Sequence, residues 1–430
     1  MVQSPTSARL RRDFSSSPDA RLPAAENRLY YPALDGLRAI AVLMVFTTHY
    51  VWLPAALNWG WAGVDLFFVL SGFLITGILY DSRNARRRLR VFYIRRCLRI
   101  FPVYYLVLLG GVVLYGVFHW QLHRGLWLWP VYLGNYARLI WPNEAMAWPP
   151  VYEDLRSGLH LASPFFYHLD HLWSLCVEEQ FYLVWPFVVF LVKDRVRLRN
   201  LCLGVVVVMP AIRLACLHAA PAQLIDLGLL QRVMPLRADS LLLGGAIALA
   251  LRGPERTKIT ALGRPALRLL MVLFAALEIA MRLRTGRFID AVYMGHHSVF
   301  GYTLPALFAA AVILLALDPG SGVYRLCMNL PMRWLGQRSY GFYVYHLLLF
   351  SAFRWVALTL CLGHKAYLWQ VTAAVALAGT TALSWVSFRW FEAPLLRLKD
   401  RYARPEAGSV PRLVEPVRAG ERDKDYIPAA

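Results

Sequence analysis

Ionisable residues lie inside several long apolar segments of the sequence, where a charged side chain is costly. Arg38 and His49 share one such segment, Asp65 lies in the next, and Glu178 lies in a later one. A charge at the depth of a bilayer costs several kcal/mol, so such residues are usually functional. A neutral histidine beside a carboxylate can take a proton from a hydroxyl, because the carboxylate fixes the tautomer and stabilises the imidazolium. These residue types indicate acid–base chemistry on a hydroxylated substrate.

The spacing of Arg38 and His49 indicates a second, long substrate. The two residues are eleven positions apart, which on one helix is about three turns, so they share a face about 16 Å apart along the axis. Arg38 is level with Arg95, Arg96 and Arg99, whereas the carboxylates are level with His49. Arginines bind phosphates, and acyl-coenzyme A carries its phosphates and its thioester at opposite ends of an extended arm. The layering favours this donor; a helix-packing or proton-relay role for His49 is the alternative.

The elements that position these residues are predicted to be transmembrane helices. Of the 430 residues 58% are hydrophobic and 17% are charged, a balance that argues against a soluble enzyme. The formal net charge is +20, but the basic residues lie in short loops between apolar segments, which indicates a polytopic membrane protein and excludes nucleic acid as a partner. Ten segments of about the length of a membrane span are predicted, at 33–53, 60–80, 92–118, 171–192, 200–219, 236–251, 266–282, 299–317, 339–360 and 368–389.

Lys and Arg residues are concentrated in alternate loops, which predicts that both termini are cytoplasmic. We therefore predict an all-α integral membrane protein with about ten transmembrane helices. Its parts are a cytoplasmic tail (1–32), a transmembrane domain (33–398) and a cytoplasmic, disordered tail (399–430), with an extracytoplasmic Trp- and Pro-rich loop at 119–170. We expect no signal peptide. The six scattered cysteines are interpreted as small hydrophobic residues, and no metal is expected.

Several local strings, taken in order, resemble membrane acyltransferase family 3 over about residues 33–398. The resemblance implies ten transmembrane helices and transfer of an acyl group, often acetyl, from cytoplasmic acyl-CoA to a hydroxyl on an extracytoplasmic glycan or other envelope acceptor. We expect no fused C-terminal esterase-like domain. The strings are LDGLRAIAVLMVFTTHY from Leu34, GVDLFFVLSGFLI from Gly63, FYIRRCLRIFPVYY from Phe92, HLWSLCVEEQFYLVWP from His171, RADSLLLGG from Arg237, LGQRSYGFYVYH from Leu335 and WFEAP from Trp390.

The resemblance also assigns roles to positions that match the family motifs. His49 corresponds to the essential histidine, and Asp65 and Glu178 to carboxylates that could orient it. The predicted site consists of the catalytic residues His49, Glu178 and Asp65, the donor-binding residues Arg38, Arg95, Arg96, Arg99, Ser339, Tyr340 and His346, and the acceptor-binding residues Trp173, Arg237 and Asp239.

These observations predict an O-acyltransferase of the bacterial inner membrane that uses acyl-CoA, with acetyl-CoA as the expected donor and no metal. Its partners would be the lipid bilayer and an envelope glycan, a glycolipid or a small hydroxylated acceptor. The first alternative is a transporter or flippase for a lipid-linked or acylated substrate, in which the buried ionisable residues relay protons. Visible repeat symmetry is missing, which weighs against it. A non-catalytic glycan-binding protein is a further alternative.

Overall fold

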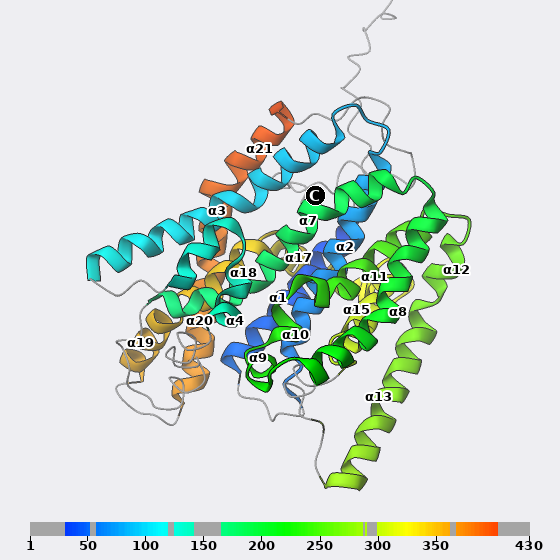
Figure 1. Ribbon diagram of the computed structural model, residues 1–430. Coiled ribbons are helices and arrows are strands. Elements are labelled where there is room, and N and C mark those ends of the chain that lie inside the picture. Colours follow the sequence, from blue (N-terminus) through cyan, green and yellow to red (C-terminus); the bar gives the residue numbers. More distant parts are fainter. Residues whose placement is uncertain are drawn as a thin grey trace, which may run out of the picture.

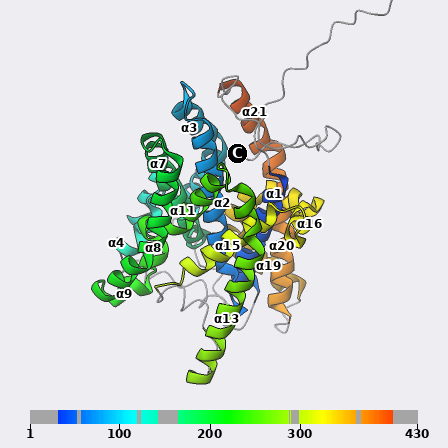
Figure 2. The same ribbon diagram turned by 90° about the vertical axis from the view of Figure 1, so that its right-hand side faces the viewer.

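The computed structural model describes residues 31–51, 57–118, 124–141, 165–286, 289, 299–361 and 367–402. Within these ranges the chain is helical and has no β-strand, which confirms the predicted all-α class. Figures 1 and 2 show helices of unequal length and tilt packed into one bundle, with α1 and α2 near its centre. Most of the two predicted tails and most of the predicted 119–170 loop lie outside the described residues.

Each of the ten predicted apolar segments contains a helix, and the 339–360 segment contains two. Five of the described helices are long and apolar enough to cross a membrane, or six if the bent pair α18 and α19 forms one span. The main helices are α1 (Pro32–Tyr50), α2 (Gly63–Asp81), α3 (Arg88–Phe118), α7 (Trp173–Leu191), α8 (Arg195–Ala219), α11 (Ala238–Ala250), α13 (Gly263–Thr285), α15 (Thr303–Ala316), α18 (Ser339–Leu348), α19 (Phe350–Leu360) and α20 (Leu368–Ser387).

Shorter helical elements connect or flank these helices. They are η2 (Gly60–Ala62), η3 (Arg124–Val131), η4 (Gly134–Tyr136), α4 (Ala137–Ile140), η5 (Phe165–Leu172), α9 (Ala222–Asp226), α10 (Leu229–Arg232), η6 (Met234–Arg237), α12 (Arg256–Ala261), α16 (Gly322–Met328), α17 (Leu330–Gln337), the π-helix η7 (Phe388–Glu392) and α21 (Ala393–Tyr402).

Helices α2 and α11 pack backbone against backbone, because small residues face each other. A Cβ atom at Gly72 would meet the carbonyl oxygen of Leu241 at 1.7 Å, and one at Gly244 would meet that of Val69 at 1.9 Å. Any larger side chain would push the helices apart, as expected where small residues mediate helix packing in membranes. This close approach fixes the position of Asp65 on α2 relative to the N-terminal end of α11.

Helix α3 runs obliquely past α2 and α7 (Figure 1) and packs against α21. It reaches α7 through long side chains. The guanidinium carbon of Arg96 lies 4.1 Å from the centre of the Tyr182 ring, and the Tyr93 hydroxyl donates to the carbonyl oxygen of Leu183 at 3.1 Å. Elsewhere along α3, a cavity lies between this helix and α2 and α7.

The segment predicted as a single span at 339–360 is broken. Helices α18 and α19 meet at Leu349 with a bend of 67°. Carbonyl groups in the last turn of a helix lose their partners within the helix and need other donors. The break therefore places hydrogen-bond acceptors inside the bundle, beside His346 in the last turn of α18.

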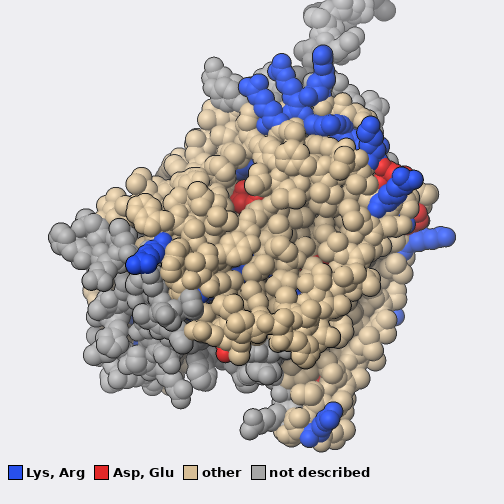
Figure 3. Space-filling view, in the orientation of Figure 1, with Lys and Arg blue, Asp and Glu red and all other residues tan. Residues whose placement is uncertain are grey.

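Basic side chains gather at one end of the molecule. Figure 3 shows them along the upper edge, the end at which the turn between α2 and α3 lies in Figure 1. Arg86 and Arg87 in this turn and Arg90 in the first turn of α3 are exposed. This gathering of basic side chains matches the charge asymmetry from which the cytoplasmic side is predicted.

Candidate active site

A cavity of about 720 Å³ lies between α3 on one side and α2 and α7 on the other. It extends along α2 from Ser82, at the basic end, to Val64 in the first turn of the helix. At about 1.5 Å per residue this run is roughly 27 Å long. The cavity walls at the basic end contain a group of arginines, namely Arg38, Arg86, Arg87, Arg88, Arg95, Arg96 and Arg99.

The four arginines predicted to bind the donor all line this cavity. Arg38, 12% exposed, forms an ion pair with Asp35 at 2.7 Å, and Arg96 lies over the Tyr182 ring. At the rim, Arg252 forms a two-pronged ion pair with Asp81, at 2.7 and 2.5 Å. Closely spaced guanidinium groups in one cavity attract a polyanion and can bind its phosphates in bidentate fashion.

The middle of the cavity contains Glu178 in a small polar cluster. The Ser71 hydroxyl donates to Glu178 Oε1 at 2.7 Å, and the Tyr182 hydroxyl donates to Oε2 at 2.9 Å. All three residues line the cavity, whereas His49 does not. The structure thus places Glu178 in the wall of the arginine-lined cavity, and its described hydrogen bonds go to these two hydroxyls.

Ser174 and Tyr343 also line the cavity. The Tyr343 hydroxyl donates to the carbonyl oxygen of His171 at 2.6 Å and lies 2.5 Å from Ser174 Oγ. Ser339 and Tyr340, both predicted to bind the donor, also line the cavity, and the Tyr340 hydroxyl donates to the carbonyl oxygen of Ile100 at 2.6 Å. Tyr343 separates this cavity from the group of histidines behind it.

Three histidines from different parts of the chain meet behind Tyr343. The centres of the His49 and His346 rings are 5.2 Å apart, and those of His171 and His346 are 5.1 Å apart. The Tyr343 ring lies 5.5 Å from His171 and 5.6 Å from His346. We call His49, His171 and His346 the histidine cluster. His346, predicted to bind the donor, is fully buried and does not line the cavity.

Backbone carbonyl groups fix the tautomers of the cluster. His49 Nδ1 lies 2.9 Å from the carbonyl oxygen of Val45, one turn earlier on α1, and His346 Nδ1 lies 2.6 Å from that of Tyr343. Because a carbonyl oxygen only accepts hydrogen bonds, each Nδ1 carries the proton and each Nε2 keeps its lone pair. A lone pair on Nε2 is what a general base requires.

The structure shows no hydrogen bond between His49 and Asp65 or Glu178, the two carboxylates predicted to orient it, among the described residues. Within the described part of the chain, the hydrogen bond of His49 goes to Val45, and those of Asp65 and Glu178 go to other side chains. The backbone replaces the carboxylate because His49 lies one turn after Val45 on the same helix face.

The broken end of α18 organises the cluster. The carbonyl oxygens of Tyr343 and Val344 accept from His346 Nδ1 and from His171 Nε2, the latter at 3.1 Å. The carbonyl oxygen of His346 accepts a short hydrogen bond from the Tyr50 hydroxyl. The side chains of His346, His171 and Tyr50 thus all bond to carbonyl oxygens in the last turns of α18.

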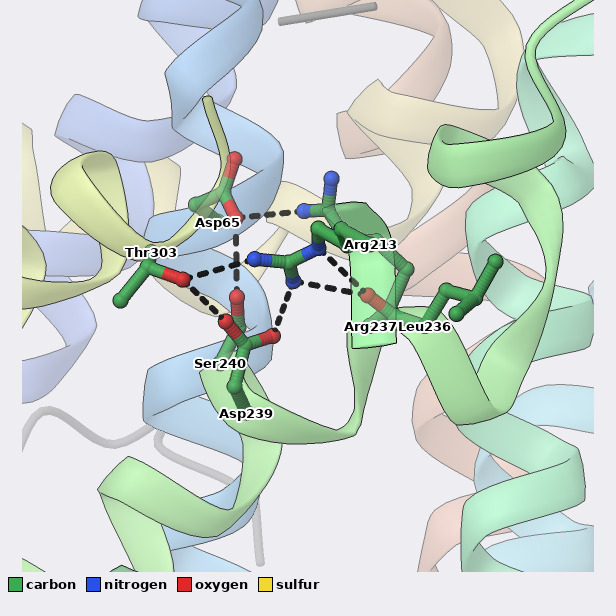
Figure 4. Close-up of polar contacts among 7 residues, drawn as sticks. All are labelled: Asp65, Arg213, Leu236, Arg237, Asp239, Ser240 and Thr303. Carbon is green, nitrogen blue, oxygen red and sulfur yellow. Dashed lines mark hydrogen bonds and ion pairs between the residues drawn. The ribbon is translucent and has the colours of Figure 1, made fainter. Parts of the chain in front are cut away.

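Asp65 belongs to a separate network that is fully buried (Figure 4). The Asp65 carboxylate forms an ion pair with Arg237 and accepts from the Ser240 hydroxyl at 3.0 Å. Arg213 lies 2.6 Å from Asp239 and 2.7 Å from Thr303 Oγ1.

This network joins α2, α8, α11 and α15. Its charges are paired with one another, as buried charges must be. These buried ion pairs indicate a structural role for Asp65, Arg237 and Asp239. The catalytic role predicted for Asp65 and the acceptor-binding role predicted for Arg237 and Asp239 stay predictions.

Trp173, also predicted to bind the acceptor, is buried and packs its ring against Phe68 at 6.1 Å between ring centres.

The sequence motifs did not assign a role to His171, Tyr343 or Tyr50. Weak signals could have identified two of them. Tyr343 precedes His346 by three positions and so shares its helix face, and His171 begins the same string that contains Glu178.

The described residues hold no group of three or more His, Cys, Asp or Glu side chains arranged to bind a metal ion. In the histidine cluster, each ring has one nitrogen at hydrogen-bond distance from a backbone carbonyl oxygen. What the cluster offers is therefore imidazole acid–base chemistry beside an arginine-lined cavity.

Comparison with known proteins supplies the family. The profile described as "Acyltransferase domain" matches residues 31–389. A Bacillus subtilis protein named "Putative peptidoglycan O-acetyltransferase YrhL" is 31% identical over 334 residues, which is 75% of this chain and 49% of that protein. Peptidoglycan O-acetyltransferase OatA of Listeria monocytogenes is 31% identical over 398 residues, 86% of this chain and 56% of that protein. The chain spans about half the length of these relatives. No solved structure gives a significant match.

Proposed function

The chain belongs to acyltransferase family 3, and we propose that it transfers an acetyl group from acetyl-CoA to a hydroxyl of a peptidoglycan-type envelope glycan. The observation that carries this proposal is the cavity itself. It has a cluster of arginines at one end, and its other end lies against the histidine cluster through Tyr343. A donor with phosphates at one end and a thioester at the other matches both ends.

In this proposal the phosphates of the donor bind Arg38, Arg95, Arg96 and Arg99, and the extended arm follows α2 past Glu178. The length of the cavity along α2, roughly 27 Å from the helix rise, leaves room for such an arm. The polar groups of Ser71, Glu178 and Tyr182 face the middle of the arm. Ser339 and Tyr340 line the same cavity and complete the donor site.

The chemistry is assigned to His49 as general base. Its Nε2 takes the proton of the acceptor hydroxyl while the hydroxyl oxygen attacks the thioester carbonyl carbon. His49 is partly exposed, so an acceptor can reach it. The Tyr343 side chain must move aside for the thioester to reach the histidine, because Tyr343 separates the cavity from the cluster.

For the membrane arrangement we propose ten spans, both termini in the cytoplasm, and location in the bacterial inner membrane. The basic end in Figure 3 is then cytoplasmic, where acetyl-CoA is made, and His49 lies toward the outer side, where the glycan is. The domain limits stay as predicted from the sequence, with the catalytic unit at 33–398.

The test uses the purified protein in proteoliposomes with radiolabelled acetyl-CoA and triacetylchitotriose as a water-soluble glycan acceptor. We expect labelled glycan with the wild type and none with His49→Ala. His218→Ala is the matched control, because His218 is also in the last turn of a helix, α8, but is exposed and outside the site. Equal transfer by wild type and His49→Ala would refute the assignment of the base. Movement of a labelled substrate across the membrane without acetyl transfer would favour the transporter alternative.

A further inference from the structure

We propose that His346 shares the proton that His49 removes from the acceptor. A second imidazole and the broken end of α18 then stabilise the protonated His49, as a carboxylate was expected to do. This inference rests on the proposed function and deepens it, because it names the group that stabilises the charged base. Neither the sequence motifs nor the cavity assign this role to His346.

The first observation is an unpaired nitrogen. His346 is 0% exposed, and its Nε2 has no hydrogen-bond partner within the described part of the chain. Leaving a buried polar atom unpaired costs free energy, so an exception to the usual pairing requires a reason. The neighbouring ring is that of His49, at 5.2 Å between centres and inclined by 62°.

The second observation is the pair of tautomers. Both rings donate from Nδ1 to backbone carbonyls, so both Nε2 atoms carry lone pairs in the resting state. When His49 Nε2 takes a proton it becomes a donor, and the neighbouring ring, His346, has an unpaired Nε2 that can accept. His49 is partly exposed and His346 is buried, so His49 faces the acceptor and His346 lies behind it.

The third observation is the position of both rings at helix ends. His49 is in the last turn of α1 and His346 is in the last turn of α18. The carbonyl end of a helix carries partial negative charge and stabilises a nearby cation. The 67° break at Leu349 thus brings a second negative helix end to the imidazole pair.

Other titratable groups lie near the pair within the described residues. Asp170, next to His171 in the chain, forms ion pairs with Arg138 and Arg232 at 3.1 and 2.6 Å. The groups that face His346 are His49 and Tyr50 from α1, His171 from η5 and Tyr343 from its own helix.

The proton balance of the transfer is simple. The acceptor oxygen bonds to the acetyl carbon, and the carbon–sulfur bond breaks with its electron pair remaining on sulfur. The hydroxyl proton passes to His49 Nε2, is shared with His346 Nε2, and leaves on the thiolate of coenzyme A. The enzyme returns to its starting state with both histidines neutral.

The experiment replaces His346 by Asn in the full-length protein in proteoliposomes, with acetyl-CoA and triacetylchitotriose as substrates. The Asn amide can keep the donor to the Tyr343 carbonyl but has no group in place of Nε2. We expect kcat to fall by roughly 100-fold, the lower end of the range for loss of an acid–base group, with an unchanged KM for acetyl-CoA and an unchanged unfolding midpoint. His218→Asn, the same substitution at an exposed helix end, should match the wild type.

A second variant separates chemistry from packing. His346→Gly leaves a space the size of the ring, and imidazole added to the buffer should restore part of kcat. Wild-type kcat in His346→Asn would overturn the inference while leaving the proposed function intact. A loss of activity that follows unfolding and that imidazole does not restore would overturn it as well. Absence of acetyl transfer in the wild type would instead refute the proposed function itself, and this inference with it.

Discussion

Replacing Asp65 tests whether it stabilises the fold or takes part in catalysis. Its carboxylate is 0% exposed and pairs with Arg237, which is 1% exposed and lies 3.8 Å from the centre of the Tyr302 ring. Asp65→Ala would leave the guanidinium buried with the aromatic ring but without its counter-charge. Breaking one partner of a buried ion pair costs about 3–5 kcal/mol. We therefore expect a large drop in the unfolding midpoint, measured by thermal or denaturant unfolding of the purified protein.

A double variant provides the matched control for this prediction. Asp65→Leu combined with Arg237→Met removes both charges together, and replacing a whole buried ion pair by apolar residues is often close to neutral. The double variant should therefore recover most of the stability lost in Asp65→Ala. Asp65→Asn keeps an acceptor for Arg237 and for the Ser240 hydroxyl, and its folded fraction should keep wild-type kcat.

Two results would refute this reasoning. If Asp65→Ala were as stable as the wild type, the ion pair would not hold the helices together. If Asp65→Asn folded with a normal unfolding midpoint but transferred no acetyl group, Asp65 would be catalytic, as the family motif suggests.

Further predictions concern the cavity, Tyr343 between the cavity and the histidine cluster, and a cysteine far from the site. Arg96→Ala should raise KM for acetyl-CoA about tenfold with little change in kcat, because it removes one charge-assisted contact to a phosphate; steady-state kinetics with an Arg90→Ala control measures this. Tyr343→Phe removes the hydroxyl that bonds to His171 and Ser174 and should lower the unfolding midpoint by the equivalent of about 1–2 kcal/mol, measured by thermal unfolding. A midpoint equal to that of the wild type would mean that these hydrogen bonds contribute nothing. Burial raises the pKa of the Cys327 thiol to about 11 from 9.0. Its thiolate fraction at neutral pH is therefore about a hundredfold smaller than in the unfolded chain, and folding loses stability as pH rises above about 9. Cys327 should resist maleimide at pH 7 until the protein is unfolded, as mass spectrometry of labelled peptides can check.

The sequence alone determined the class of the protein and the positions of its helices. Apolar length and the placement of basic residues are local properties, so the ten predicted segments each contain a helix. The same local information placed Arg38 and Arg96 on one cavity, because both lie near the basic ends of their helices. Gly72 and Gly244 allow the close approach of α2 and α11, since residues without a side chain permit backbone contact.

Only the tertiary structure decided which polar groups pair with one another. Asp65 and Arg237 are 172 positions apart, and His49 meets His346 across almost three hundred residues. A carboxylate in an apolar segment must find a partner, but its sequence does not say whether that partner is a histidine or an arginine. The outcome depended on how closely α2 and α11 pack and on the break at Leu349, which turned backbone carbonyls toward the site. Membrane class and helix positions follow from local hydropathy, whereas the identity of the side chain next to His49 follows from packing between distant helices.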